Sequence, residues 1–138
     1  MEIIVTDERD ERFIEFCSSF GCFLDEPQVV LLLTSFGKIV GCSSFKVYDA
    51  DSCEITTLFL NSYDDREKIA YKLIRQLEKI AIDYEFKKVK VIFDSKEDIL
   101  IEIFEKLDYR FVDDVCMEKE FKIFVWLFLF KKKIKFKD

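Results

Sequence analysis

One stretch of the sequence, residues 54–84, constrains the fold more than any other part of the chain. Residues 54–60, Glu-Ile-Thr-Thr-Leu-Phe-Leu, are rich in β-branched and aromatic side chains and predict a strand. From Arg66 to Tyr84, apolar residues recur every three or four positions, which is the pattern of an amphipathic helix. A strand that leads directly into a helix presents unpaired backbone N–H groups and the positive end of the helix dipole. Many folds bind phosphate at such a place, so the sequence first poses the question of whether this unit does.

The composition predicts one globular domain with a well-packed core. The chain has 138 residues, half of them hydrophobic, and includes 16 Phe but only 3 Gly and 1 Pro. This composition argues against linkers and disordered tracts. The net charge is −6, and residues 131–138 hold five Lys and one Asp, so residues 1–130 carry a net charge of −10. Such an acidic body argues against a nucleic-acid partner, which needs a basic surface.

Cysteine and histidine usage argues against a metal site. There are five Cys, an odd number with no Cys-x-x-Cys pair, and no His, so the usual ligands of zinc or haem are nearly absent. We expect the thiols to be reduced and mostly buried, without a disulfide. The N-terminus lacks the basic region and apolar run of a signal peptide, and the longest apolar run, residues 123–130, is too short to cross a bilayer as a helix. These features predict a cytoplasmic protein without a membrane span.

Hydrophobic periodicity and turn residues predict seven strands and three helices, in the order β, α, β, β, β, α, β, α, β, β. Antiparallel strands come first and a strand–helix–strand crossover follows. This order predicts an α+β (mixed α/β) single domain around one largely antiparallel sheet of about seven strands flanked by helices. The expected strands are residues 3–5, 28–34, 38–48, 54–60, 87–93, 109–112 and 115–121, and the two longer helices span residues 66–84 and begin at Ser95.

The order of elements and four short motifs resemble the GCN5-related N-acetyltransferase (GNAT) family. Gly37-Lys-Ile-Val-Gly41 resembles the family's third strand, and Cys53–Leu60 resembles its fourth. Phe104-Glu-Lys-Leu-Asp-Tyr109 resembles the helix-to-strand corner usually written Tyr-Glu-Lys-Leu-Gly-Phe, and Cys116-Met-Glu-Lys resembles the final strand. The resemblance covers about residues 3–121, so we expect a GNAT-like domain in residues 1–121. It implies transfer of acetyl from acetyl-CoA to a small-molecule or peptide amine.

The family's cofactor loop, Arg/Gln-x-x-Gly-x-Gly/Ala, falls on residues 65–70 of this chain. Ala70 fits the motif, but Lys68 stands in place of the middle Gly and Asp65 in place of the Arg. A side chain at the Gly position obstructs the close approach of the backbone to the pyrophosphate, and a carboxylate at position 65 faces it with like charge.

Two interpretations of this loop stay open. In the first, Asp64 and Glu67 form a capping box, and the helix needs no ligand. In the second, Arg66 and Lys68 replace the backbone contacts with two side-chain cations. The candidate acetyl-CoA contacts that the resemblance implies, including the strand backbone that would polarise the thioester carbonyl, are Phe59, Leu60, Arg66, Lys68, Ile69 and Ala70.

The catalytic positions that the resemblance implies are only partly filled. Where the family often has a Tyr that protonates the coenzyme thiolate, this chain has Phe104, which cannot donate a proton. Glu54, on the predicted fourth strand, is the candidate general base, although a solvated strand-edge carboxylate is the simpler interpretation of this residue. Tyr63 and Tyr109 are conceivable substitute acids that we interpret as packing residues.

A weaker resemblance connects the chain to ornithine decarboxylase antizyme, a non-catalytic relative of this fold that binds another protein. Antizyme also lacks the glycine loop and has Phe at the position of Phe104. The alternative function is therefore a catalytically silent, antizyme-like or regulatory protein. The silent alternative predicts no response to acetyl-CoA.

The C-terminal segment, residues 122–138, joins an apolar run to a basic end. Residues 121–130 are apolar on both faces of any strand, and Lys131-Lys-Lys133 follows at once. We expect this run to pair along a sheet edge with a second chain and so to make a homodimer. A membrane-surface anchor with its lysines at the lipid headgroups is the alternative.

Overall fold

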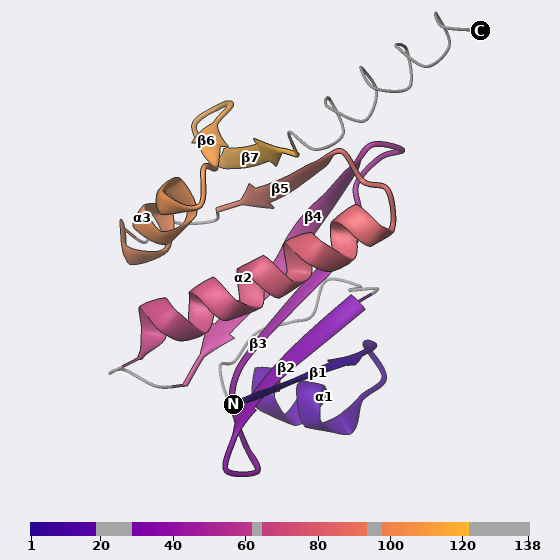
Figure 1. Ribbon diagram of the computed structural model, residues 1–138, viewed down its shortest axis with the longest axis vertical. Coiled ribbons are helices and arrows are strands. Elements are labelled where there is room, and N and C mark those ends of the chain that lie inside the picture. Colours follow the sequence, from indigo (N-terminus) through magenta and orange to yellow (C-terminus); the bar gives the residue numbers. More distant parts are fainter. Residues whose placement is uncertain (19–28, 62–64, 94–97, 122–138) are drawn as a thin grey trace, which may run out of the picture.

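The computed structural model describes residues 1–18, 29–61, 65–93 and 98–121. Within them the chain forms seven strands and three helices in the expected order (Figure 1). The elements are β1 (Glu2–Thr6), α1 (Glu11–Ser18), β2 (Val29–Ser35), β3 (Lys38–Val47), β4 (Ser52–Leu60), α2 (Arg66–Asp83), β5 (Lys88–Ile92), α3 (Asp98–Lys106), β6 (Arg110–Phe111) and β7 (Cys116–Glu120).

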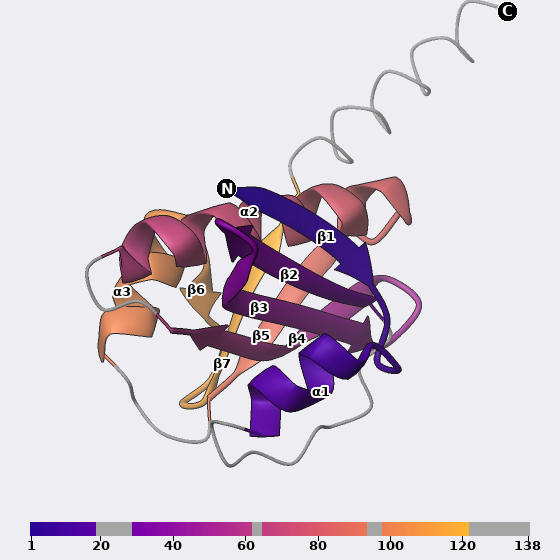
Figure 2. The same ribbon diagram turned by 90° about the horizontal axis from the view of Figure 1, so that it is seen from below.

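The seven strands form one sheet in the order β1-β2-β3-β4-β5-β7-β6. Every neighbouring pair is antiparallel except β4 and β5, which run parallel because α2 crosses over between them. In Figure 2, α2 and α3 lie on one face of the sheet and α1 lies on the other. The predicted class, an α+β domain around a mostly antiparallel seven-stranded sheet, is confirmed.

Two hydrophobic clusters, one on each face, hold the helices to the sheet. The larger cluster joins α2 and α3 to the central strands, and α2 contributes Leu73 and Leu77 to it. The smaller cluster lies under α1 and consists of Phe13, Cys17, Val30, Leu32 and Cys42. Because successive residues of a strand point to opposite faces, β2 supplies both clusters, which explains why it is a continuous apolar run.

One glycine sets how closely α2 approaches the sheet. A Cβ atom on Gly41 of β3 would lie 2.9 Å from Ile69 Cγ2 and 3.1 Å from Leu73 Cδ1. The first turns of α2 therefore rest directly on the backbone of β3. This contact fixes the position of the helix N-terminus relative to the end of β4.

The predicted hairpin at Ser35-Phe36-Gly37 is confirmed, with Phe36 and Gly37 both at positive φ (51° and 78°), as a tight two-residue turn requires. Other predictions fall outside the described residues. These are the start of a helix at Ser95, the position of Tyr63, and the pairing of residues 122–138 with a second chain, which stays a prediction. Among the helices described, none has the length and apolar character needed to cross a membrane.

Candidate active site

The candidate site begins where β4 and β5 separate. The two strands pair from Ser52 opposite Lys88 to Ile55 opposite Val91, and β4 then continues to Leu60 whereas β5 ends at Ile92. An opening of about 210 Å³ lies between the diverging ends. Eight of its ten lining residues are apolar or aromatic, and the ten come from β4, β5, the residue after β5, and α3: Ile55, Thr56, Thr57, Leu58, Phe59, Val91, Ile92, Phe93, Leu100 and Phe104.

A β-bulge marks the level at which the strands part. Ser44 of β3 lies opposite Thr57, and the next residue of β3, Phe45, lies opposite Ile55, so Thr56 is the extra residue. The hydroxyls of Ser44 and Thr56 lie 2.8 Å apart and hold the bulge to β3. Because a bulge bends its strand and increases the local twist, it explains why β4 leaves β5 here.

Backbone direction along β4 decides which amides face the opening. Asn61 N–H donates to the Val40 carbonyl of β3 at 2.8 Å, so this residue points its backbone groups toward β3. Since these groups alternate in direction along a strand, we infer that the N–H groups of Leu58 and Leu60 point toward the β5 side. Phe59 belongs to the lining, whereas the Leu60 side chain is buried in the core. Leu60 thus fits a carbonyl-polarising role through its amide, together with Leu58, which the sequence did not suggest.

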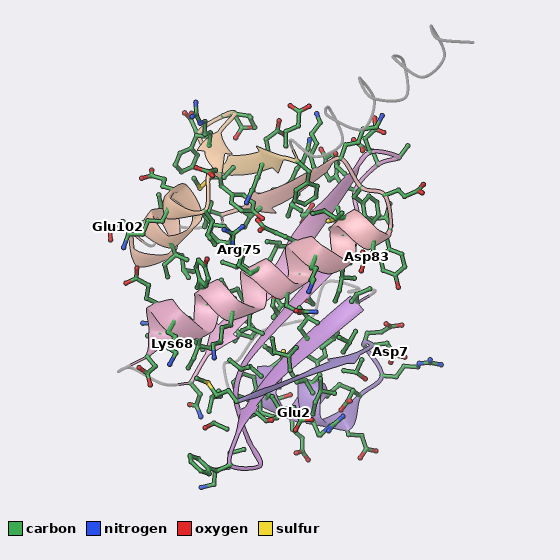
Figure 3. All side chains as sticks on the ribbon, in the orientation of Figure 1. Glu2, Asp7, Lys68, Arg75, Asp83 and Glu102 are labelled. Atoms are coloured by element: carbon green, nitrogen blue, oxygen red, sulfur yellow. The ribbon has the colours of Figure 1, made fainter. Side chains whose placement is uncertain are left out.

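The first turn of α2 brings the predicted cations to the end of β4. Arg66 is half-buried and Lys68 is exposed, and Figure 3 shows Lys68 at this end of the helix. Ile69 and Ala70, the other two predicted contacts, are buried in the core, and the Ile69 N–H donates to the Asp65 carbonyl at 2.9 Å. Their contribution is therefore to seat the helix.

The predicted capping box is wrong. The N-cap residue is Asp65, and its side chain makes no capping hydrogen bond. Asp64 lies outside the described residues, and Glu67 pairs instead with Lys106 of α3, whose Nζ lies 2.6 Å from Glu67 Oε1. The hydrogen bond to this carboxylate raises the pKa of Lys106. Among the described residues, the helix start therefore has no reciprocal side-chain cap on its first amides.

The electrostatic balance around this turn favours an anion only slightly. Among the described residues of this turn and its neighbour α3, the cations Arg66, Lys68 and Lys106 lie near the carboxylates of Asp65 and Glu67. A surface depression of about 460 Å³ lies over this turn, lined by Asp65, Glu67, Lys68 and Tyr71. Lys106 pairs with Glu67, and the positive end of the helix dipole adds to the attraction for an anion.

Glu54 lies close to the opening but does not line it. Its Cα is opposite Lys46 of β3 and Lys90 of β5, one residue before the last β4–β5 pair. Its neighbour Ile55 faces the α2 cluster, so Glu54 lies on the other face of the sheet, and it is half-buried there. Lys90 Nζ lies 3.9 Å from Glu118 Oε2. The predicted base thus belongs to a row of residues with alternating charge on neighbouring strands: Lys46, Glu54, Lys90 and Glu118.

The aromatic residues near the opening do not offer a proton. Phe104 lines it, with ring centroids 5.9 Å from Phe93 and 4.9 Å from Tyr109. Tyr109 is buried beside Glu78 of α2, and burial, with the carboxylate's charge, raises the pKa of its hydroxyl. Thr56 and Thr57 carry the only hydroxyls among the described residues that line the opening.

Sequence reasoning missed two features around this site. Glu78 is a buried carboxylate, paired with Lys119 Nζ at 3.1 Å. Its position four residues after Ile74, on the apolar stripe of the helix, was an available signal. The Glu67–Lys106 pair joins residues 39 positions apart, and no local sequence pattern predicts it. Within the described ranges, no group of three or more His, Cys, Asp or Glu side chains is placed to hold a metal ion.

Comparison with known proteins assigns this architecture to the GNAT acetyltransferase fold. No protein-family model and no curated protein sequence matches the chain. Among solved structures, aminoglycoside 6'-acetyltransferase type Ii superposes with a TM-score of 0.70 at 17% identity, over 87% of this chain and 97% of that enzyme. N-acetylglutamate synthase of Neisseria gonorrhoeae, complexed with coenzyme A and N-acetylglutamate, gives 0.68 at 11% identity over 87% of this chain and 35% of its own.

A third solved structure includes the cosubstrate. A GNAT-family acetyltransferase of Elizabethkingia anophelis with acetyl-CoA bound gives a TM-score of 0.64 at 11% identity, over 86% of this chain and 98% of its own. The fold of the chain is therefore that of the GNAT acetyltransferases. At these identities the likeness concerns the fold, and the activity of this protein is argued from its own residues.

Proposed function

We propose that this protein is an N-acetyltransferase that moves acetyl from acetyl-CoA to an amine. The observation that carries the proposal is the opening between the diverging ends of β4 and β5, which the chain follows directly with the cationic first turn of α2. A slot lined mostly by apolar residues, in a chain that next forms a helix start with two cations, suits a ligand with an extended arm and a diphosphate.

Arg66 and Lys68 would hold the diphosphate through their side chains. A Gly-rich loop brings backbone amides to phosphate, but the Lys68 side chain stands where such a loop has its middle Gly. Two cations within one helical turn, at the positive end of the helix dipole, supply comparable attraction from a greater distance. The amides of Leu58 and Leu60 would donate to the thioester carbonyl and stabilise the charge that develops on its oxygen.

The amine would reach the thioester from the face of the sheet that carries Glu54. In this mechanism the amine nitrogen bonds to the carbonyl carbon, the carbon–sulfur bond breaks, and the amine proton passes to Glu54 through a water molecule. The departing thiolate takes its proton from solvent, since the described lining residues include no acidic phenol. The acidic body of the chain favours a cationic amine.

The transfer assay uses the full-length protein, acetyl-CoA and a panel of amines comprising a polyamine, an aminoglycoside and a lysine-containing peptide. We expect release of free coenzyme A thiol with at least one amine, together with a product that gains one acetyl group in mass spectrometry. The matched variants are Arg66→Ala with Lys68→Ala, which should lose activity, and Lys72→Ala with Lys79→Ala, which removes two cations farther along α2 and should not. Thiol release that no amine increases would contradict the proposal.

A second candidate function, a catalytically silent protein that binds another protein, has specific support. Phe104 occupies the place of a proton donor, and Asp65 brings a carboxylate to the helix start. A silent protein of this kind would release no thiol with any amine and would give no heat with acetyl-CoA. These two outcomes separate the candidates without knowledge of the natural substrate.

A further inference from the structure

Two buried cysteines from distant parts of the sequence meet on the face of the sheet opposite α2. Cys17 lies in the last turn of α1 and Cys42 in the middle of β3, and their sulfur atoms are 4.0 Å apart. Both side chains are buried, and both are free thiols. A disulfide bond is about 2 Å long, so the sulfurs need to approach by about 2 Å to form one.

The surroundings of the pair are apolar, and within the described part of the chain few side chains of α1 are fully buried. The other members of the cluster are Phe13, Val30 and Leu32. Phe13 and Cys17 are the only buried residues of α1, which is eight residues long. A short helix that buries two side chains opens locally at a much lower cost than the core under α2, so a small reagent gains access to the sulfurs.

The two thiols differ in their readiness to ionise. The hydrogen bond between them lowers the pKa of Cys17, and the same contact, with burial, raises the pKa of Cys42. Because the thiolate is the form that attacks an oxidant, the lowered pKa favours Cys17 as the first sulfur to react. Cys42, directly beside it, is then placed to react with the oxidised sulfur.

We propose that Cys17 and Cys42 are a redox modification site that forms a reversible disulfide when the protein meets a peroxide. The Cys17 thiolate attacks one oxygen of hydrogen peroxide, the O–O bond breaks, and sulfenic acid and water result after proton uptake. Cys42 sulfur then bonds to Cys17 sulfur, the S–O bond breaks, and a second water leaves with the Cys42 proton. Two thiols are oxidised by two electrons, and one peroxide is reduced to two waters.

The place of the pair gives the modification a structural consequence. Cys42 is directly opposite Phe59 in the β3–β4 ladder, and the Phe59 side chain packs against the same small cluster. Phe59 is also one of the residues that line the opening between β4 and β5. A disulfide would tie α1 covalently to the strand behind this residue. It would also close a loop between positions 25 residues apart, which stabilises the folded chain.

The experiment treats the reduced full-length protein with hydrogen peroxide, blocks the remaining thiols by alkylation, and maps disulfides in a non-reduced chymotryptic digest. Chymotrypsin cuts after Phe16 and Phe20, so Cys17 and Cys22 fall in different peptides. We expect a Cys17–Cys42 linked peptide that reductant removes, and a melting temperature several degrees above that of the reduced protein. Absence of this peptide, or linkage of Cys17 to Cys22 instead, would overturn the proposal.

Single substitutions provide the matched comparison. Cys42→Ala should abolish the linked peptide and the rise in melting temperature. Cys53→Ala removes another fully buried thiol, whose pKa burial raises to about 12, and should leave both unchanged. Because peptide mapping on the wild type does not involve acetyl-CoA, it decides the redox site whether or not the proposed transferase activity is found.

Discussion

At the scale of single residues, Asp108 occupies a conformation that favours glycine. Its φ is +72°, at the corner between α3 and β6, and its side chain is exposed. A non-glycine residue there costs about 1 kcal/mol relative to Gly. We predict that Asp108→Gly raises the free energy of unfolding by about 0.5–1 kcal/mol in urea denaturation. Glu105→Gly, at an exposed position inside α3, should lower it by a similar amount. A change of the same sign in both variants would contradict this account.

Gly41 is required for a different reason, the close contact between β3 and α2. Its backbone lies against Ile69, where an added Cβ atom would be only 2.9 Å from a methyl carbon. We predict that Gly41→Ala lowers the free energy of unfolding by about 1–3 kcal/mol, because a rigid neighbour has to move. Combining it with Ile69→Ala should cost less than the two single changes together, as thermal or urea denaturation would show. Strict additivity would argue against the contact.

At the scale of elements, α1 depends on its first turn. The Asp10 carboxylate accepts hydrogen bonds from the Thr6 hydroxyl and from the backbone N–H of Arg12, both at 2.9 Å. These hydrogen bonds, together with one from the Arg12 guanidinium that has the largest effect, hold the pKa of Asp10 well below its ordinary value. The stabilisation is therefore fully present above the unfolded pKa of about 3.9 and is lost as pH falls toward the lowered folded value.

We predict that Asp10→Asn lowers the free energy of unfolding by about 1 kcal/mol at pH 7. The difference in free energy of unfolding between wild type and variant should become smaller at pH 2, because only the wild type loses the carboxylate's contribution on acidification. Urea denaturation at the two pH values measures both quantities, with Asp83→Asn at the exposed end of α2 as the control. A larger difference at pH 2 than at pH 7 would contradict the claim that the ionised carboxylate stabilises the folded protein.

The pair between α2 and α3 modulates charge at the candidate phosphate site. Glu67 and Lys106 are both largely exposed, so their ion pair contributes little to stability. Glu67→Gln removes a carboxylate from the first turn of α2 and leaves Lys106 available to an anion. We predict about two- to fivefold tighter binding of acetyl-CoA by calorimetry at low salt. Asp83→Asn, at the exposed far end of α2 (Figure 3), should not change it, and weaker binding by Glu67→Gln would mean that the pair is needed to position α3.

The elements themselves were largely predictable, because each carries its own periodicity. The stripe from Ile69 to Leu77 predicted α2 closely, and the run from Glu54 to Leu60 predicted β4. The helix cap was not predictable, because acidic residues stand at both positions 64 and 65 and only the backbone path selects between them. The orientation of the Leu58 and Leu60 amides was also hidden, since it follows from the β3–β4 register and not from residue type.

At the scale of the whole molecule, the sheet and its crossover were predictable from the sequence. Whether the site between them binds a ligand was not. The order of strands and helices, with four short motifs, led to the fold that the structural comparisons support. The candidate site assembles residues from β4, β5, α2 and α3, and contacts over such sequence distances leave no local pattern. Whether Arg66 and Lys68 replace a glycine loop likewise depends on how the two side chains are placed relative to each other, which residue type alone does not determine.

The central claim, that the first turn of α2 holds the diphosphate of acetyl-CoA, is tested most directly by titration calorimetry. We predict measurable heat for the wild type and for Lys72→Ala with Lys79→Ala, and at least tenfold weaker binding for Arg66→Ala with Lys68→Ala, as expected when two charge-assisted contacts of about 1 kcal/mol or more are lost. Asp65→Asn should strengthen binding, because it removes a like charge. No heat from the wild type at millimolar acetyl-CoA would contradict the claim, and equal heat from both double variants would place the diphosphate elsewhere.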